Sequence, residues 1–132
     1  MKISWKAIIL YSLILLPIYA FTQKDSSSSL LGTKWYFYKE YSDPGGGGSW
    51  DRVSDADSKK YFELQKDGEV SGDYFFYAKY YTVKDSLSFE LLDSSQKVKA
   101  HYSYTRYKDT LYISRLDYLC KEGCGWMFVK RD

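Results

Sequence analysis

Apolar and aromatic residues alternate with polar residues in short runs along most of the chain after residue 33. Alternation with a period of two is typical of β-strands that turn one face toward a core. In the first run, TKWYFYKEY, one expected face carries Trp35, Phe37 and Lys39. The other face then carries Tyr36, Tyr38 and Glu40. The pattern predicts single strands at 34–40, 61–65, 69–75, 97–106 and 126–131, and hairpins at 81–92 and 104–116.

Turn residues connect these runs. KDGE at 66–69 places Asp-Gly between two alternating runs, which is a strong hairpin signal. The segments YTVKDSLSFELL and YTRYKDTLYISRL share an order of Tyr-Thr, a Lys-Asp-Ser/Thr turn, a leucine and an alternating strand, so they form an approximate internal repeat. We expect their core faces, and that of the strand at 97–106, to carry Leu87, Phe89, Leu91, Val98, Ala100, Tyr102, Tyr104, Leu111 and Ile113.

About eight short strands joined mostly by tight turns, with no convincing helix, define the expected fold. A meander of such strands can bury its apolar face and remove its exposed edges by closing on itself. The sequence therefore predicts an all-β domain, a small up-and-down antiparallel β-barrel. An open β-sandwich is the alternative.

The N-terminal segment is expected to lie outside this domain. MKISWK is basic, AIILYSLILL is apolar and too short to span a bilayer, and small residues follow. This pattern predicts a signal peptide at 1–22, cut after Thr22 or after Ala20; a buried N-terminal helix is the alternative. Residues 23–30 are then a serine-rich disordered tether, and 31–132 form the barrel domain of an exported protein, located in the periplasm or outside the cell.

The composition after residue 22 adds constraints on function. Without Lys2 and Lys6, 17 of the 19 basic residues remain, which balances the 17 acidic residues. A protein that binds nucleic acid would show a basic face, so we do not expect a nucleic-acid partner. The 15 tyrosines suit half-buried sheet surfaces and the partly hydrated walls of a cavity.

The two cysteines lie in CKEGC, as Cys120 and Cys124. In an exported protein an even cysteine count indicates a disulfide, and Gly123 permits a tight return of the chain. A redox-active pair is an alternative, although its usual spacing is C-x-x-C. A zinc site is a further alternative, but it requires more ligands than two cysteines and the single histidine, His101, can supply.

DPGGGGSWDR contains four consecutive glycines in the expected connection 41–59. It lacks the lysine and the following helix of a phosphate-binding loop. Three interpretations remain: a loop over the barrel mouth that is anchored by Trp50, a flexible excursion without function, and a loop that contacts another protein. Long connections inside small domains are commonly functional lids or disordered.

Few residues indicate a metal site or a catalytic site. Asp51, Asp55 and Asp57 lie close in sequence but lack the Asp-x-Asp-x-Asp-Gly pattern of a calcium loop, so solvated side chains are expected and no metal site. His101 falls on the polar face of its strand, and no motif supplies it with a nucleophile. We therefore expect no catalytic residue, no cofactor and no enzyme activity. Tyr102 and Tyr104 face inward, either as core packing or as the wall of a ligand cavity.

Six motifs follow one another along the chain: LLGTKWYF, the PGGGGSW loop, F-x-L-x-x-D-G, the paired Tyr…Lys-Asp-Ser/Thr-Leu hairpins, CKEGC and FVKR. In this order, residues 30–132 resemble small secreted bacterial lipocalin-like domain proteins. Two residues, Thr33 and Lys34, separate Gly32 from Trp35, whereas the family usually has one residue there, as Gly-x-Trp. The resemblance implies a barrel that holds a small apolar ligand. We expect a monomer without a membrane anchor that binds a small hydrophobic or aromatic ligand at the barrel mouth, through Trp35, Tyr41, Trp50, Tyr102 and Tyr104. The alternative is a structural or protein-interaction module with a filled barrel and no ligand.

Overall fold

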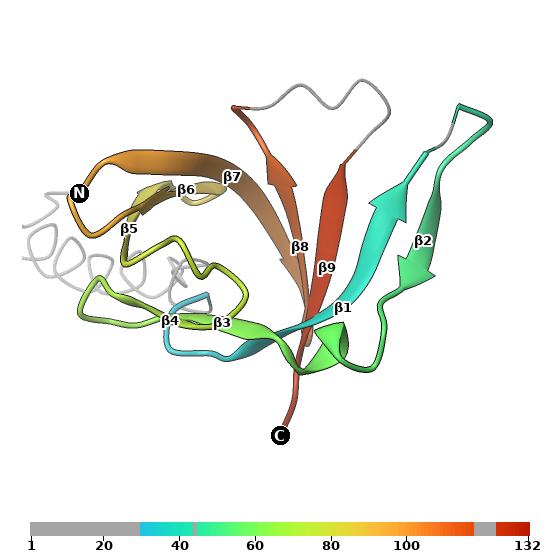
Figure 1. The fold of residues 1–132 in the computed structure, drawn as a ribbon, viewed down its shortest axis with the longest axis horizontal. Helices are drawn as coiled ribbons and strands as arrows, with labels where there is room; N and C mark the ends of the chain where they lie inside the picture. Colours follow the sequence, from blue (N-terminus) through green and yellow to red (C-terminus); the bar gives the residue numbers. More distant parts are fainter. Residues whose placement is uncertain (1–29, 44, 118–123) are drawn as a thin grey trace, which may run out of the picture.

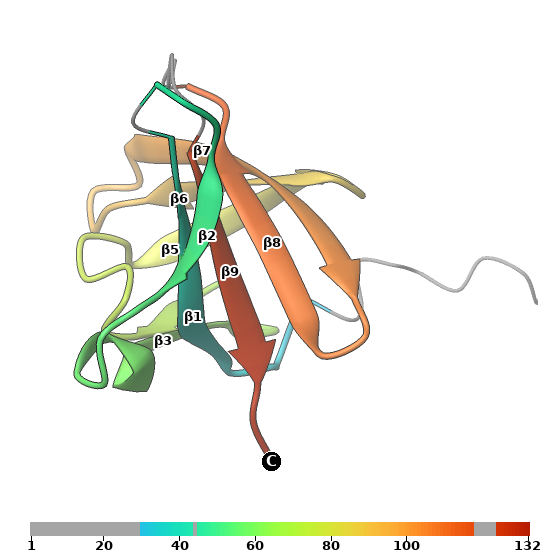
Figure 2. The ribbon, with the colours of Figure 1, turned by 90° about the vertical axis from the view of Figure 1, so that its right-hand side faces the viewer.

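The computed structural model describes residues 30–43, 45–117 and 124–132, and in these residues the strands form a nearly closed antiparallel barrel (Figures 1 and 2). The predicted fold class is therefore confirmed. The predicted signal peptide, most of the tether, and Cys120 lie outside the described residues. No helix in the described part of the chain is long and apolar enough to cross a membrane. The strands are β1 (Trp35–Ser42), β2 (Ser49–Arg52), β3 (Tyr61–Leu64), β4 (Val70–Gly72), β5 (Tyr80–Asp85), β6 (Ser88–Leu92), β7 (Val98–Tyr107), β8 (Thr110–Arg115) and β9 (Gly125–Lys130).

The strands follow the order β4-β3-β1-β9-β8-β7-β6-β5 around the barrel, and β2 pairs with β1 outside this path. β1 pairs with β3 through Trp35 and Tyr36 and then, farther along the same strand, with β2 through residues 39–42. The two ends of the order, β4 and β5, meet through a single bridge between Glu69 and Tyr80. Backbone hydrogen bonds from Val70 to Lys79 and from Tyr81 to Gly68 flank this bridge.

Large side chains fill one end of the barrel. Its fully buried aromatic residues are Trp35, Phe62, Phe89 and Phe128. The indole Nε1 of Trp35 donates a hydrogen bond to the carbonyl oxygen of Leu30 at 3.3 Å. On the other side, the guanidinium carbon of Arg106 lies 5.3 Å from the centroid of the Trp35 ring system. Alternation explains this core, since successive strand residues point to opposite sides of the sheet.

Most of the predicted core faces are confirmed: Phe89, Leu91, Ala100, Tyr102, Tyr104, Leu111 and Ile113 are all buried. The predicted facing is wrong at two positions. Leu87 is exposed because it lies in the turn between β5 and β6. Val98 is exposed because the β6–β7 register shifts beside it, between Leu91 and Leu92.

A β-bulge in β1 corrects the predicted faces of that strand. Phe37 pairs with Phe128 of β9, but Lys39 pairs with the next residue, Met127, so Tyr38 is an extra residue in the ladder. An extra residue reverses the facing of everything that follows it. Glu40 therefore pairs with Trp126 on the inner side, and Lys39 faces outward, opposite to the sequence-based expectation.

The expected long connection 41–59 is mostly ordered. β1 extends to Ser42, and β2 returns beside it, so the glycines form the tip of a hairpin that stands away from the rest of the barrel in Figure 1. Gly45 and Gly47 adopt positive φ angles of 102° and 108°, which glycine does at low cost. A short 3₁₀-helix, η3 (Asp57–Lys59), connects β2 to β3.

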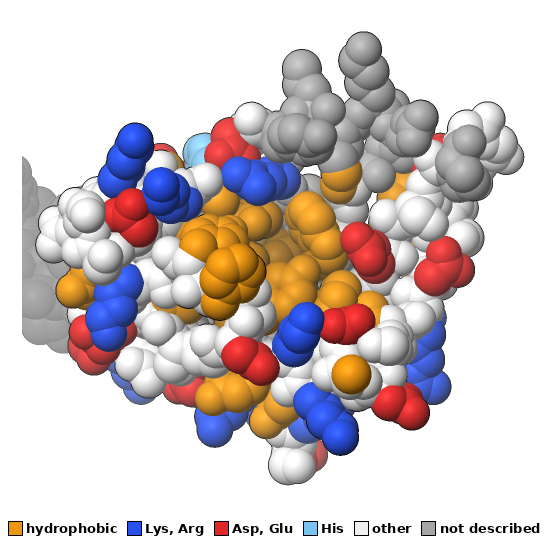
Figure 3. All heavy atoms as spheres, viewed as in Figure 1, with side chains coloured by type: hydrophobic (Ala, Val, Ile, Leu, Met, Phe, Trp, Pro, Cys, Tyr) orange, Lys and Arg blue, Asp and Glu red, His pale blue; other side chains and the backbone are white. Residues whose placement is uncertain are grey.

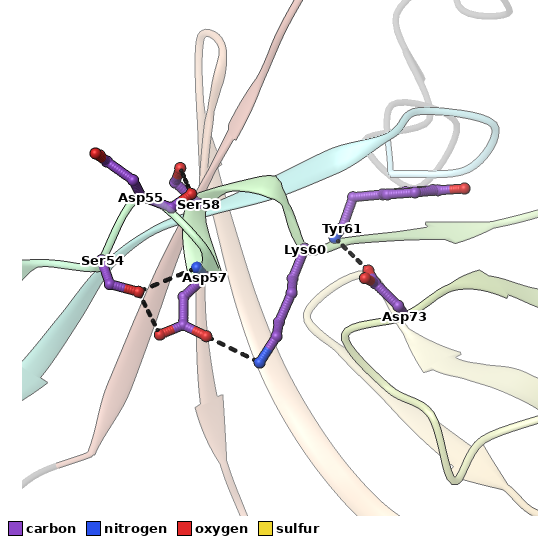
Figure 4. Close-up of polar contacts among 7 residues, drawn as sticks. All are labelled: Ser54, Asp55, Asp57, Ser58, Lys60, Tyr61 and Asp73. Carbon is purple, nitrogen blue, oxygen red and sulfur yellow. Dashed lines mark hydrogen bonds and ion pairs between the residues drawn. The ribbon is translucent and has the colours of Figure 1, made fainter.

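Figure 4 shows the polar contacts around η3. The Ser54 hydroxyl donates to the Asp57 carboxylate at 2.8 Å and accepts from the Asp57 backbone N–H at 3.1 Å. Asp57 also forms an ion pair with Lys60 at 2.8 Å, and hydrogen bonds to Lys60 and Ser54 lower its pKa. The three aspartates of this segment do not converge on one point, and no group of metal-ligating side chains gathers within the described ranges.

Candidate functional site

The end of the barrel opposite Trp35 is not filled to the surface. Figure 3 looks onto this part of the molecule and shows apolar side chains at the centre of a hollow, with acidic side chains on the side where β1 and β2 run in Figure 1. Tyr77, Tyr102 and Trp126 contact one another in series at this end. Tyr74 is the fourth member of the group: it is coupled electrostatically to Tyr77 and Glu40, and its ring packs on Phe37, Phe75 and Phe128. We call this group the aromatic hollow.

The turn after β4 supplies two of the four residues. β4 was expected to continue to residue 75, but it ends at Gly72, whose φ of 97° turns the chain. Asp73 then fixes the turn by accepting a hydrogen bond from the backbone N–H of Tyr61 at 3.0 Å (Figure 4). The turn at 74–77 carries Tyr74 and Tyr77 to the mouth of the barrel.

Between these two tyrosines, Phe75 points into the barrel and is 3% exposed. Its ring centroid lies 4.9 Å from that of Phe62 and 5.4 Å from that of Tyr102. Phe75 thus fills interior space between Phe62 and Tyr102. The neighbouring Phe76 points outward and is 87% exposed.

Tyr102 lies beneath the aromatic hollow as part of the core and is 5% exposed. Its ring stacks on Phe89 at 5.6 Å and meets Trp126 edge to face at 6.2 Å. Its hydroxyl oxygen lies 3.0 Å from that of Tyr77. The Arg115 guanidinium carbon lies 5.9 Å from the Tyr102 ring centroid, a cation–π arrangement.

Burial controls the ionisation of these phenols. It raises the pKa of Tyr74, with Glu40 as the second cause. It also raises the pKa of Tyr102, and the hydrogen bond between Tyr102 and Tyr77 adds to the increase. The pKa of Tyr77 is raised by burial as well. All three phenols are therefore neutral at ordinary pH, and one of the two protons of Tyr77 and Tyr102 is used in the hydrogen bond between them.

Charged groups surround the aromatic hollow. Arg115 donates from Nε to the Asp117 carboxylate at 2.8 Å and from Nη2 to the Lys99 carbonyl oxygen at 3.1 Å. The hydrogen bond to Asp117 raises the pKa of Arg115, and the same bond lowers that of Asp117. Glu40 is the register partner of Trp126 on the adjacent strand, and its strand β1 is separated from β8, which carries Arg115, by β9 alone.

The five residues expected to bind a ligand occupy three different places. Only Tyr102 belongs to the aromatic hollow. Trp35 is fully buried at the filled end, and Tyr104 packs against Phe89 with a buried hydroxyl that has no hydrogen-bond partner in the described structure. Tyr41 and Trp50 lie together on the outer face.

The outer position of Trp50 follows from its contacts. Its ring lies 5.4 Å from Tyr41 and 5.9 Å from Tyr112, and Tyr112 alternates with the buried residues Leu111 and Ile113. A Cβ atom on Gly125 would lie 3.1 Å from the Trp50 ring, so the absence of a side chain at Gly125 leaves room for the indole. Trp50 therefore anchors the β2 hairpin to the outside of β8 and β9 and does not face the hollow.

Sequence reasoning missed Tyr74, Tyr77 and Trp126. The signal for the first two was the run DYFFYAKYY, whose consecutive aromatic residues break the alternation expected of a strand. Trp126 shares a face with Phe128 in WMFVKR and could have been selected by alternation alone. Cys124 has no free thiol, but its predicted partner Cys120 lies outside the described residues, so that pairing stays a prediction.

Comparison with known proteins found no matching family model, no matching curated protein and no matching solved structure. The likeness to lipocalin-like domains beyond the barrel fold thus stays a prediction from the sequence.

Proposed function

We propose that this protein is a secreted, non-enzymatic, monomeric binding module that holds a small hydrophobic or aromatic ligand in the aromatic hollow, as lipocalin-like domains do. The observation that carries this proposal is the hollow with apolar side chains at its centre in Figure 3, together with the contacts that join Tyr77, Tyr102 and Trp126 at the same end of the barrel. Aromatic walls with a few polar groups are typical of sites for small molecules. The basic and apolar pattern of residues 1–22 supports export without a membrane anchor.

Phe75 favours a second candidate, a structural or protein-interaction module whose barrel is filled. This side chain occupies interior space that a deeply bound ligand would need. Under that alternative, the hollow is only a surface depression and the outer face is the functional surface. The two candidates differ in whether a small molecule binds at the end of the barrel that contains Tyr102.

Native mass spectrometry of protein purified from its own host tests the proposal. We expect a co-purified small molecule with a stoichiometry of about one. The same preparation should bind a fluorescent apolar probe after the ligand is stripped, and Trp126→Ala should weaken that binding. Trp50→Ala is the matched control, because its indole lies on the outer face. Absence of both a ligand and probe binding would favour the filled-barrel alternative.

A further inference from the structure

Two carboxylates stand side by side at the edge of the aromatic hollow. Glu40 of β1 and Asp51 of β2 are direct partners in the antiparallel register, and Glu40 also pairs with Trp126 of β9. Side chains of directly opposed residues share one face of a sheet. Because the bulge at Tyr38 reverses the facing of Glu40, both carboxylates lie on the sheet face that carries Trp126, and both side chains are exposed to solvent. Figure 3 shows acidic side chains on this side of it.

Neither carboxylate has a basic partner in the part of the chain that the structure describes. Asp51 accepts hydrogen bonds only from the hydroxyls of Ser42 and Ser49 among these residues. The basic residues of the same hairpin, Lys39 and Arg52, oppose each other on the outward face. Like charges placed directly opposite each other in a sheet are destabilising, and a bound cation would relieve that repulsion.

The rings beside the carboxylates suit the same kind of ligand. A cation over the face of a tryptophan or tyrosine is attracted by the negative charge of the π system, and the attraction grows when water is displaced. Trp126 lies directly across from Glu40, and Tyr102 meets Trp126 at 6.2 Å. Tyr74 is close enough to Glu40 for that carboxylate to raise its pKa.

The basic side of the hollow is less suited to an anion. Arg115 is the basic residue that contacts Tyr102, but its charge is compensated by Asp117 at 2.8 Å. A second guanidinium nitrogen is used by the Lys99 carbonyl oxygen. A carboxylate ligand would compete with Asp117 for Arg115 and would be repelled by Glu40.

We infer that the aromatic hollow selects small organic cations, with an amine or quaternary ammonium group beside Glu40 and Asp51 and an apolar body against the half-buried ring of Trp126. This inference rests on the proposed function and specifies its ligand class. The indole ring binds the body of the ligand, and the two carboxylates supply the preference for positive charge. The preference is electrostatic, so it should weaken as salt is added.

Calorimetric titration with three probes that share the same apolar body tests the inference. Each probe has a phenylbutyl body and ends in trimethylammonium, in the uncharged tert-butyl group, or in a carboxylate. At low salt we expect the trimethylammonium probe to bind about 10-fold more tightly than the tert-butyl probe, and the carboxylate probe to bind most weakly. Equal affinity of the first two probes, or preference for the carboxylate, would overturn the inference while leaving the proposed function intact.

Matched variants locate the charge preference. Glu40→Gln and Asp51→Asn should each reduce the affinity for the trimethylammonium probe by about 5-fold and leave the tert-butyl probe unchanged. Glu63→Gln is the control, because Glu63 alternates with the buried residues Phe62 and Leu64 and faces outward. If Glu63→Gln has the same effect as Glu40→Gln, general surface charge explains the selectivity and the inference fails. If none of the three probes binds, the proposed function fails and this inference fails with it.

Discussion

The hydroxyl oxygens of Tyr77 and Tyr102 lie 3.0 Å apart, and this contact joins the turn after β4 to the wall strand β7. The two residues are 25 positions apart in sequence. The hydrogen bond holds the turn that carries Phe75 against the barrel. It therefore couples the shape of the aromatic hollow to the packing of the interior.

Tyr102→Phe removes this hydrogen bond and leaves the aromatic ring in place. We expect a loss of about 1 kcal/mol in the free energy of unfolding, the usual net contribution of one such bond. Urea unfolding followed by tryptophan fluorescence measures the change. Tyr107→Phe is the control, because Tyr107 lies on the same strand and is 65% exposed. Equal midpoints for the two variants would show that the contact does not stabilise the fold.

Alkaline pH should destabilise the protein. Burial raises the pKa of Tyr74, Tyr77 and Tyr102 above the ordinary 10.0, so the folded state holds these protons more tightly than the unfolded state. Their contribution is fully present below pH 10 and is lost as pH rises above it. Each group adds a slope of up to about 1.4 kcal/mol per pH unit.

Urea midpoints measured from pH 8 to pH 11.5 test this prediction, because this range begins below the ordinary tyrosine pKa of 10.0 and extends above it. The decline above pH 10 should be shallower in Tyr74→Phe and in Tyr102→Phe than in the parent protein. A midpoint that stays level throughout the range would contradict the buried placement of the phenols.

Phe75→Ala and its neighbour Phe76→Ala should behave very differently. Phe75 is 3% exposed inside the barrel, so its truncation should cost about 3–5 kcal/mol. Phe76 is 87% exposed, and its truncation should change stability by less than about 0.5 kcal/mol. Thermal or urea unfolding of both variants measures the contrast.

The same pair of variants reports on ligand binding. Removing Phe75 extends the aromatic hollow toward the core, so a variant that still folds should accept a longer apolar probe than the parent protein. Stability losses of equal size in the two variants would mean that the turn at 73–77 does not insert Phe75.

Gly72→Ala should be strongly destabilising. The φ of Gly72 is 97°, and an added Cβ would lie 2.3 Å from the carbonyl oxygen of Tyr61. The neighbouring atom belongs to the backbone of β3 and cannot move aside alone, so we expect a cost of at least about 2 kcal/mol. Gly46→Ala is the control, because a Cβ there meets no atom within 4 Å. Similar unfolding free energies for the two variants would contradict the sharp turn at Gly72.

Alternation made the barrel predictable, because burying one face of each strand fixes every second residue. Ala100, Tyr102 and Tyr104 followed from this rule. The rule failed at Glu40, since the bulge at Tyr38 depends on how β1 meets β9 and leaves no mark in the local pattern. It failed again at Val98, where the register with β6 shifts.

The site was less predictable than the fold because distant segments form it. Tyr102 could be assigned to the interior from its own strand. Its contact with Tyr77 depends on a turn that begins at Gly72, and the neighbouring pattern suggested a continuous strand there. Trp50 was expected to reach the mouth, but hydrogen bonding of β2 to β1 sets its side chain on the outer face beside Tyr112.

The bridge between Glu69 and Tyr80 also determines how the barrel can change size. Elsewhere in the strand order, ladders of paired residues fix the spacing of neighbouring strands at about 4.8 Å. Between β4 and β5, one bridge and two flanking backbone hydrogen bonds carry the closure. This line is therefore a weakly paired seam of the barrel, as is the seam between β1 and β3, where two residue pairs form the ladder. A guest too large for the hollow would widen the barrel at these seams, while the wall formed by β6, β7, β8 and β9 keeps its curvature.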